Sequence, residues 1–175
     1  MSGRQSAPEF SRLVAADTIS NHVHRREIAA EPAERKALAQ RFGLLSLDLL
    51  DAALELHRQA GDVIHVSGHL SADVVQSCAV SGDDLPVTIA EPLHLRFVPE
   101  APVEAEELDL EEDELDEIPY SGTAFDLGEA VAQSLALAID PYATGPDADR
   151  VRKEKGLLDE AASGPFAALA GLKKD

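Results

Sequence analysis

The feature that most constrains the fold is a strict alternation of apolar and polar residues in two neighbouring segments. Residues 63–78, "VIHVSGHLSADVVQSC", and residues 87–99, "VTIAEPLHLRFVP", both repeat with a period of two, and a turn-like "VSGDDLP" separates them. This period is typical of strands with one buried face. Two such strands joined by a short turn predict an antiparallel hairpin, in which Pro92 implies an edge position or a bulge.

More strands are expected on the N-terminal side of this hairpin. Short segments that favour the strand conformation occur there at residues 10–14, 22–30 and 44–57. The last of these contains both adjacent leucines and alternation, so we expect a central irregularity in that strand. "QAGD" at 59–62 favours a turn. The segments together predict an antiparallel meander of about five or six strands, a common sheet size.

Two helices are expected to pack on one face of this sheet. Over residues 31–43, Pro32 suits the first helical turn and Gly43 can end the helix in a left-handed conformation. Over residues 126–139, Asp126 can cap the helix and Pro141 disfavours its continuation. The fold class is therefore predicted to be α+β, an antiparallel meander packed by two main helices and interrupted by a long acidic loop.

Negative charge is concentrated in one segment. The net charge is −18, and eleven carboxylates with no base lie between Glu100 and Glu117. Like charges at this density oppose compaction, so residues 99–119 are expected to form a flexible insertion. Such a field repels the phosphates of nucleic acids and attracts basic proteins.

One domain is expected, because 175 residues suit a single core with appendages. The predicted organisation is a disordered tail (1–8), a domain that contains the acidic insertion (9–148), and a mobile C-terminal tail (149–175) with a short amphipathic segment (165–173). No apolar run reaches the length of a signal peptide or a membrane span, so a cytoplasmic location is expected.

The sequence contains no motif of a known catalytic site, such as a nucleophile elbow, a Walker loop or a dinucleotide fingerprint. The single cysteine, Cys78, lies on the apolar face of its strand and is expected to be a buried, inert thiol. His65 and His69 share a strand face but lie about 13 Å apart, too far to bind one ion. No enzymatic activity, metal, cofactor or small-molecule substrate is expected.

A resemblance appears where three features occur in order: a strand pair whose turn follows Cys78, an acidic tract, and "FDLGEAVAQSLALAIDPYATGPDA". The chain resembles the large ribosomal RNA subunit accumulation protein family, YceD, through the pattern D-L-x-E-x-x-x-[EQ]-x-L-x-L-x-x-x-P. The closing "GPFAALAGLK" resembles the tail of alphaproteobacterial members. The pattern falls on Asp126, Leu127, Glu129, Gln133, Leu135, Leu137, Asp140 and Pro141.

The resemblance implies a non-catalytic role in accumulation of large-subunit (23S) rRNA and in ribosome assembly. Many relatives carry further cysteines after the position of Cys78 and after the second helix, and this chain has none there, so a metal role does not transfer. With the negative charge, the resemblance suggests transient binding of a basic ribosomal protein or assembly factor, with rRNA involved indirectly. The expected partner-binding residues are Glu104, Glu106, Glu107, Asp109, Glu111, Glu112, Asp113, Glu114, Asp116, Glu117, Asp126, Glu129, Gln133, Asp140, Pro141 and Tyr142.

Two alternatives remain open at this point. The first is direct contact with rRNA through a basic cluster that spans the second strand and the first helix, made of Arg25, Arg26, Arg35, Lys36 and Arg41. The second is a small metal-dependent hydrolase, because His22 and His24 would face the same way on a strand, about 7 Å apart.

Overall fold

The computed structural model describes residues 8–100 and 116–155 of the chain. Its main feature is a sheet in the strand order β2–β3–β4–β5–β6. The strands are His24–Ala29, Ser46–Arg58, Ile64–Ser77, Asp84–Pro99 and Asp116–Tyr120. The first four pair in an antiparallel way, as the predicted meander requires, and the structure confirms the α+β class.

The fifth strand, β6, departs from the meander because it runs parallel to β5. It also corrects the predicted end of the acidic insertion. Residues 116–119 were assigned to a flexible loop, but they pair with residues 95–98 of β5. The prediction considered only the density of charge. Ile118 and Tyr120 pack with the hydrophobic core, and these apolar contacts hold the segment on the sheet.

A second, two-stranded sheet lies beside the first. β1 (Leu13–Ala15) pairs in an antiparallel way with β7 (Ala124–Asp126). The strand predicted over residues 10–14 is therefore shorter and belongs to this small sheet. Short 3-10 helices follow β1 at Ala16–Thr18 (η1) and β3 at Ala60–Asp62 (η2), where a turn was predicted.

The irregularity predicted for β3 is present but lies near its start. The register between β3 and β4 shifts between Leu47 and Leu49, and the remainder of β3 pairs continuously. One face of β4 is buried through the alternate residues that the sequence pattern indicated, including Ile64, Val66 and Leu70. The period of two thus predicted the face of this strand correctly.

Helix α1 (Pro32–Phe42) begins and ends as predicted. Its first turn holds a capping box between Glu31 and Glu34, and Gly43 follows with a left-handed φ of 68°. Helix α2 (Leu127–Ala138) has Asp126 as its N-cap. A third helix, α3 (Ala148–Glu154), lies in a region that was predicted to be mobile. No helix within the described residues is long and apolar enough to cross a membrane.

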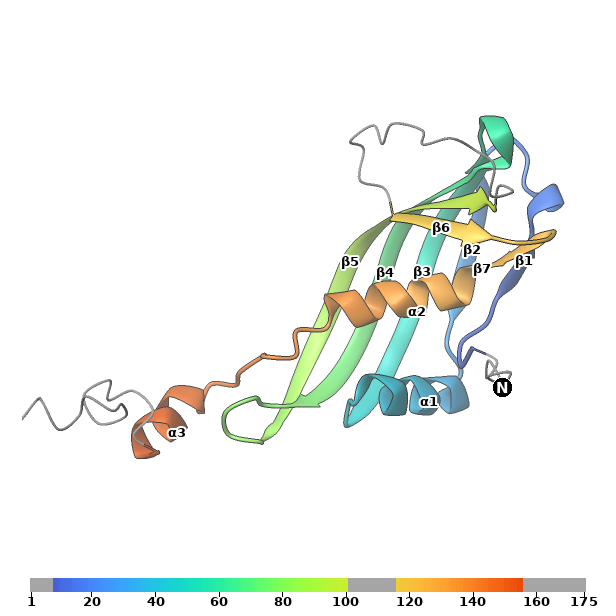
Figure 1. The fold of residues 1–175 in the computed structure, drawn as a ribbon. Coiled ribbons are helices and arrows are strands. Elements are labelled where there is room, and N and C mark those ends of the chain that lie inside the picture. Colours follow the sequence, from blue (N-terminus) through green and yellow to red (C-terminus); the bar gives the residue numbers. More distant parts are fainter. Residues whose placement is uncertain (1–7, 101–115, 156–175) are drawn as a thin grey trace, which may run out of the picture.

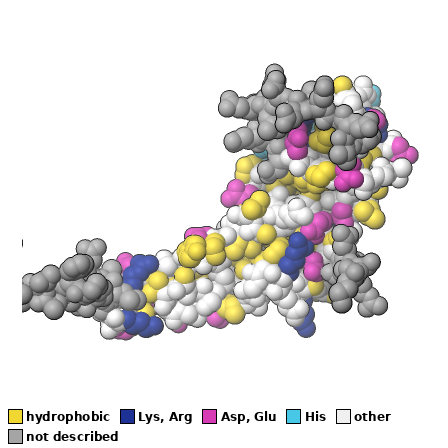
Figure 2. Space-filling view, in the orientation of Figure 1, with side chains coloured by type: hydrophobic (Ala, Val, Ile, Leu, Met, Phe, Trp, Pro, Cys, Tyr) yellow, Lys and Arg dark blue, Asp and Glu magenta, His cyan; other side chains and the backbone are white. Residues whose placement is uncertain are grey.

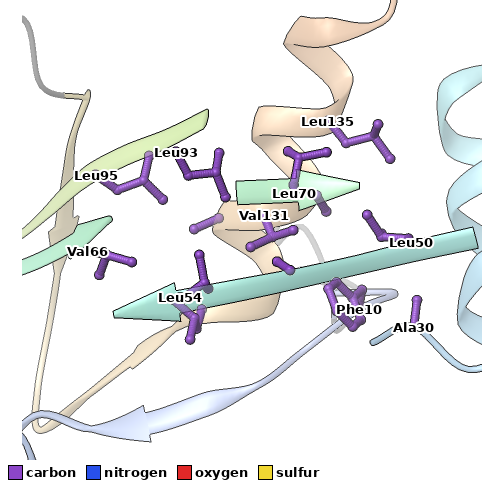
Figure 3. Close-up of a cluster of buried hydrophobic side chains, with 14 of the residues drawn as sticks. Phe10, Ala30, Leu50, Leu54, Val66, Leu70, Leu93, Leu95, Val131 and Leu135 are labelled. Carbon is purple, nitrogen blue, oxygen red and sulfur yellow. The ribbon is translucent and has the colours of Figure 1, made fainter. Parts of the chain in front are cut away.

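The core lies between the sheet and α2, which crosses one face of the sheet (Figure 1). In Figure 3, Val131 and Leu135 of α2 point toward Leu50, Leu54 and Leu70 of the strands. All five side chains are almost fully buried. Burial of side chains of this size contributes about 1.5–3 kcal/mol each. The opposite face of the sheet, here called the open face, carries polar residues such as Ser67 and His69.

Candidate partner-binding surface

The start of α2 is fixed by the carboxylate of Asp126. Its Oδ1 accepts hydrogen bonds from the backbone N–H of Glu129 (3.1 Å) and of Arg12 (2.8 Å). Its Oδ2 accepts a hydrogen bond from the hydroxyl of Ser11 (2.6 Å). A cap of this kind satisfies an N–H group that the helix itself leaves without a partner. Asp126 therefore joins α2 to the segment that enters β1. Both of its carboxylate oxygens accept hydrogen bonds from groups of the same domain.

The carboxylate of Glu129 joins α2 to α1. It accepts two hydrogen bonds from the guanidinium of Arg41, at 2.8 and 2.9 Å, and one from the side-chain amide of Gln133 at 3.1 Å. The hydrogen bond from Arg41 is the main reason that the pKa of Glu129 lies below its usual value. Arg41 also pairs with Glu9 at 3.0 Å. Only half of a capping box forms at the start of α2: Asp126 accepts the N–H of Glu129, but the Glu129 side chain is directed to Arg41.

A second paired arginine joins the N-terminal segment to α1. Arg12 donates two hydrogen bonds, of 2.7 and 2.9 Å, to the carboxylate of Glu34. These hydrogen bonds are the largest cause of the lowered pKa of Glu34 and of the raised pKa of Arg12. Charge-assisted pairs with two parallel hydrogen bonds also fix geometry. This pair and the Arg41–Glu129 pair therefore orient α1 relative to α2 and β1.

The chain after α2 is also held by internal hydrogen bonds. The carbonyl of Asp140 accepts a hydrogen bond from the buried side chain of Gln76 at 2.8 Å, and its carboxylate accepts one from the N–H of Tyr142 at 2.8 Å. The side chain of Tyr142 is 80% exposed. Of the expected partner-binding residues around α2, Gln133, Asp140, Pro141 and Tyr142 are exposed.

The acidic residues expected to bind a partner fall largely outside the described part of the chain; these are Glu104, Glu106, Glu107, Asp109, Glu111, Glu112, Asp113 and Glu114. Asp116 and Glu117 begin β6. Glu117 pairs with Arg96 of β5 at 3.0 Å. The described end of the tract is therefore anchored in the sheet.

The predicted basic cluster is divided between two regions. Arg25 and Arg26 line a depression of about 510 Å³ on the open face, with His69 and His94. Arg25 is paired with Glu55, which also lines this depression.

The remaining members of the cluster lie near α1. Arg35 and Lys36 line a separate depression beside the start of β3. Arg41 is held by Glu9 and Glu129. The five residues therefore do not form one continuous basic surface.

The histidines do not assemble into a metal site within the described residues, where no group of three His, Cys, Asp or Glu side chains could hold an ion. The ring of His24 lies 3.0 Å from the N–H of Ser20. On the open face, the rings of His57 and His65 lie 5.0 Å apart. Burial is the main reason that the pKa of His65 is lowered.

Cys78 is buried, as predicted. Its sulfur accepts hydrogen bonds from the N–H of Gly145 at 3.3 Å and of Ser81 at 3.5 Å. The N–H of Gly145 is the largest cause of a lowered pKa of the Cys78 thiol, the side chain and then the N–H of Ser81 add to it, and the pKa falls to about 6. Sequence analysis missed this property because the donors come from two loops that are distant in sequence.

Sequence analysis also missed a groove between β5 and α2. The α2–β5 groove has a volume of about 400 Å³ and is lined by Glu91, Pro92, Leu93, His94, Leu95, Ser134, Leu137 and Ala138. Leu137 is an apolar residue of α2 that does not join its buried side, since 82% of it is exposed. Pro92 was the one signal of this surface, because it implied an edge strand.

Comparison with known proteins agrees with the resemblance noted in the sequence. The family model "Large ribosomal RNA subunit accumulation protein YceD" matches residues 66–173, which extend from β4 through α3 and include the Asp126 cap. No curated protein and no solved structure matches the chain. The family name refers to accumulation of the large-subunit rRNA and to no chemical reaction. The matched residues make up more than half of the sequence, and the chain belongs to the large ribosomal RNA subunit accumulation protein YceD family.

Proposed function

We propose that this chain supports accumulation of large-subunit rRNA in the cytoplasm by transiently binding a basic ribosomal protein or assembly factor. Binding would mask lysine and arginine side chains of the partner until rRNA displaces the chain. A protein with a net charge of −18 binds phosphate groups poorly. It attracts cationic surfaces and increases the rate at which it encounters them. No catalytic step is part of this proposal.

The observation that supports the proposal is that arginine side chains form ion pairs with acids of the same chain. Ion pairs hold Arg12, Arg25, Arg41, Arg58, Arg96, Arg150 and Arg152. Each pair neutralises one acid and leaves the large acidic excess unchanged. The outward field is therefore negative, and it would be strongest where the carboxylates of residues 100–117 are concentrated.

The test uses individually purified large-subunit ribosomal proteins and the full-length chain. A variant with Gln and Asn in place of the ten acids from Glu104 to Glu117 should lose most of its affinity at low salt, because these acids supply the attraction. The control replaces an exposed acid elsewhere, Glu27→Gln. Unchanged affinity of the neutralised variant would contradict the masking mechanism.

Direct contact with rRNA is the second candidate function. The observation that favours it is the open-face depression, where Arg25 and Arg26 lie with His69 and His94. Glu27 and Glu55 line the same depression and reduce its attraction for phosphate. Binding of an rRNA fragment that weakens steeply with salt, and that is lost in Arg25→Ala/Arg26→Ala, would favour this function over masking.

A further inference from the structure

The first part of β5 forms an edge of the sheet. β6 pairs with β5 only from Leu95 to Pro99. Between Asp84 and His94, β5 pairs with β4 on one side, and no strand within the described residues pairs with its other side. In Figure 1, the lower half of β5 forms the left margin of the sheet. An edge of this kind presents backbone groups that another strand can bind.

The prolines of β5 show which backbone groups point outward. Pro86 and Pro92 pair with β4 without a shift of register, so their nitrogens must face away from it, as proline has no N–H to donate. Two hydrogen bonds agree with this orientation of the backbone, in which even-numbered residues of β5 face away from β4 and odd-numbered residues face it. The N–H of Glu100 donates to Tyr120 of β6, and the N–H of Cys78 donates to the carbonyl of Asp83.

Even-numbered residues of β5 therefore direct their backbone groups to the open edge. Four N–H groups point there, from Asp84, Thr88, Ala90 and His94. Five carbonyls accompany them, because Pro86 and Pro92 contribute an oxygen but no donor and the carbonyl of His94 faces β6. The edge thus has more hydrogen-bond acceptors than donors. It favours a partner that supplies N–H donors beyond those of its backbone.

The α2–β5 groove runs beside this edge. Leu137 contributes an exposed apolar side chain, and Glu91 contributes a carboxylate from the strand itself. No lysine or arginine lines the groove. In Figure 2, hydrophobic side chains gather on this face where the C-terminal half of α2 lies. An added strand would direct alternate side chains into this groove.

We propose that the open edge of β5 and the α2–β5 groove bind an extended, lysine- or arginine-bearing segment of a partner protein as an added strand. The proposal rests on the proposed function and specifies how the basic partner is held. Backbone hydrogen bonds supply affinity, Leu137 contacts an apolar side chain, and Glu91 attracts a basic one. Surplus N–H groups of lysine or arginine suit the excess of carbonyl oxygens.

Two other occupants fit the edge less well. A second copy of this chain would bring two molecules of net charge −18 together and would place prolines on both edges, which opposes edge-to-edge pairing. RNA would meet carbonyl oxygens and Glu91, which repel phosphate.

The first test is the matched pair Ala90→Pro and Ala90→Thr. Ala90→Pro removes an outward N–H and keeps the pairing with β4, as Pro86 and Pro92 already do; Ala90→Thr keeps the N–H. Each variant is titrated with the purified large-subunit ribosomal protein that binds the wild-type chain. Affinity should fall about tenfold or more in Ala90→Pro, equivalent to about 1.4 kcal/mol, and stay within about twofold in Ala90→Thr.

The groove is tested with a second matched pair. Leu137→Lys places a positive charge beside the bound segment and should weaken binding, whereas Leu13→Lys changes another exposed leucine, on β1, and should not. Hydrogen exchange of the wild-type complex gives an independent readout. The amides of Thr88, Ala90 and His94 should be protected by the partner, while those of Ile89 and Leu93 should change little.

The outcomes separate this proposal from the proposed function. Binding that is unaffected by Ala90→Pro, with no protection at Thr88, Ala90 and His94, overturns strand addition and leaves masking in place. Binding of none of the basic proteins overturns both. A dimer of the free chain that Ala90→Pro abolishes would assign the edge to a second copy and would also overturn the proposal.

Discussion

The guanidinium of Arg41 and the carboxylate of Glu129 join α1 to α2 through two parallel hydrogen bonds of 2.9 and 2.8 Å. The pair connects residues that are 88 positions apart in sequence. It explains why an acid follows the Asp126 cap at this spacing, since the acid holds two helices in place. Asp126 and Glu129 of the family motif are therefore used to hold the architecture of the domain.

A double-mutant cycle should detect this pair as a stabilising interaction. Arg41→Ala, Glu129→Ala and the double variant should show a coupling of about 1–2 kcal/mol in urea unfolding, because both side chains are partly buried and the contact is bidentate. The control cycle is Arg25→Ala with Glu55→Ala. Arg25 is 83% exposed, so its coupling should be below about 0.5 kcal/mol. Equal couplings in the two cycles would contradict this ranking.

Local sequence signals were sufficient for most of the fold. The period of two predicted the buried face of β4, and Pro32, Gly43 and Asp126 marked helix ends correctly, because each signal depends on neighbours within a few residues. β6 was missed because its pairing with β5 is parallel and spans a long acidic segment. The exposure of Leu137 was not predicted, because helical periodicity cannot tell which side of a broad apolar helix meets the sheet.

Acid should weaken the contact between Arg12 and Glu34. The hydrogen bond from Arg12 lowers the pKa of Glu34 in the folded state, so the unfolded state binds more protons as pH falls, and the stabilisation is lost as pH drops through the folded pKa. Glu34→Gln should cost about 1–2 kcal/mol at pH 7, and the difference from wild type should shrink toward pH 3. Urea unfolding across this pH range measures it.

Glu27→Gln, at an exposed position of β2, is the control for this measurement. Its free energy of unfolding should follow the wild-type pH dependence. A difference between Glu34→Gln and wild type that stays constant from neutral pH to pH 3 would show that Glu34 does not stabilise the fold through its charge.

Gly128 should not tolerate a larger residue. A Cβ atom at this position would lie 2.6 Å from the carbonyl oxygen of Phe10 and 2.9 Å from the nitrogen of Arg12. Alanine in a helix is ordinarily favoured over glycine by about 1 kcal/mol, yet Gly128→Ala should destabilise the domain by about 1–3 kcal/mol, since backbone must move. Gly145→Ala is the control, because its Cβ would make an ordinary 3.6 Å contact with Leu85. In thermal unfolding, Gly128→Ala should therefore unfold at a lower temperature than Gly145→Ala.

The candidate surface was harder to predict than the fold. Its edge depends on where β6 stops pairing with β5, and its groove depends on the position at which α2 crosses the sheet. Neither is encoded within a short window of sequence. By contrast, the acidic tract was visible at once, because charge density requires no knowledge of the fold.

The thiol of Cys78 should titrate near neutral pH. The N–H of Gly145, and then the side chain and N–H of Ser81, lower its pKa to about 6. The thiolate absorbance of the folded protein should therefore rise with a midpoint there, against about 8.5 for an unperturbed cysteine. Gly145→Pro removes the larger donor and should raise the midpoint, while Gly145→Ala keeps the N–H and should not. Because the folded pKa is the lower one, the free energy of unfolding should increase with pH from about 6 to 8.5 in wild type, relative to Cys78→Ser. A wild-type midpoint at the unperturbed value would show that these N–H groups do not stabilise the thiolate.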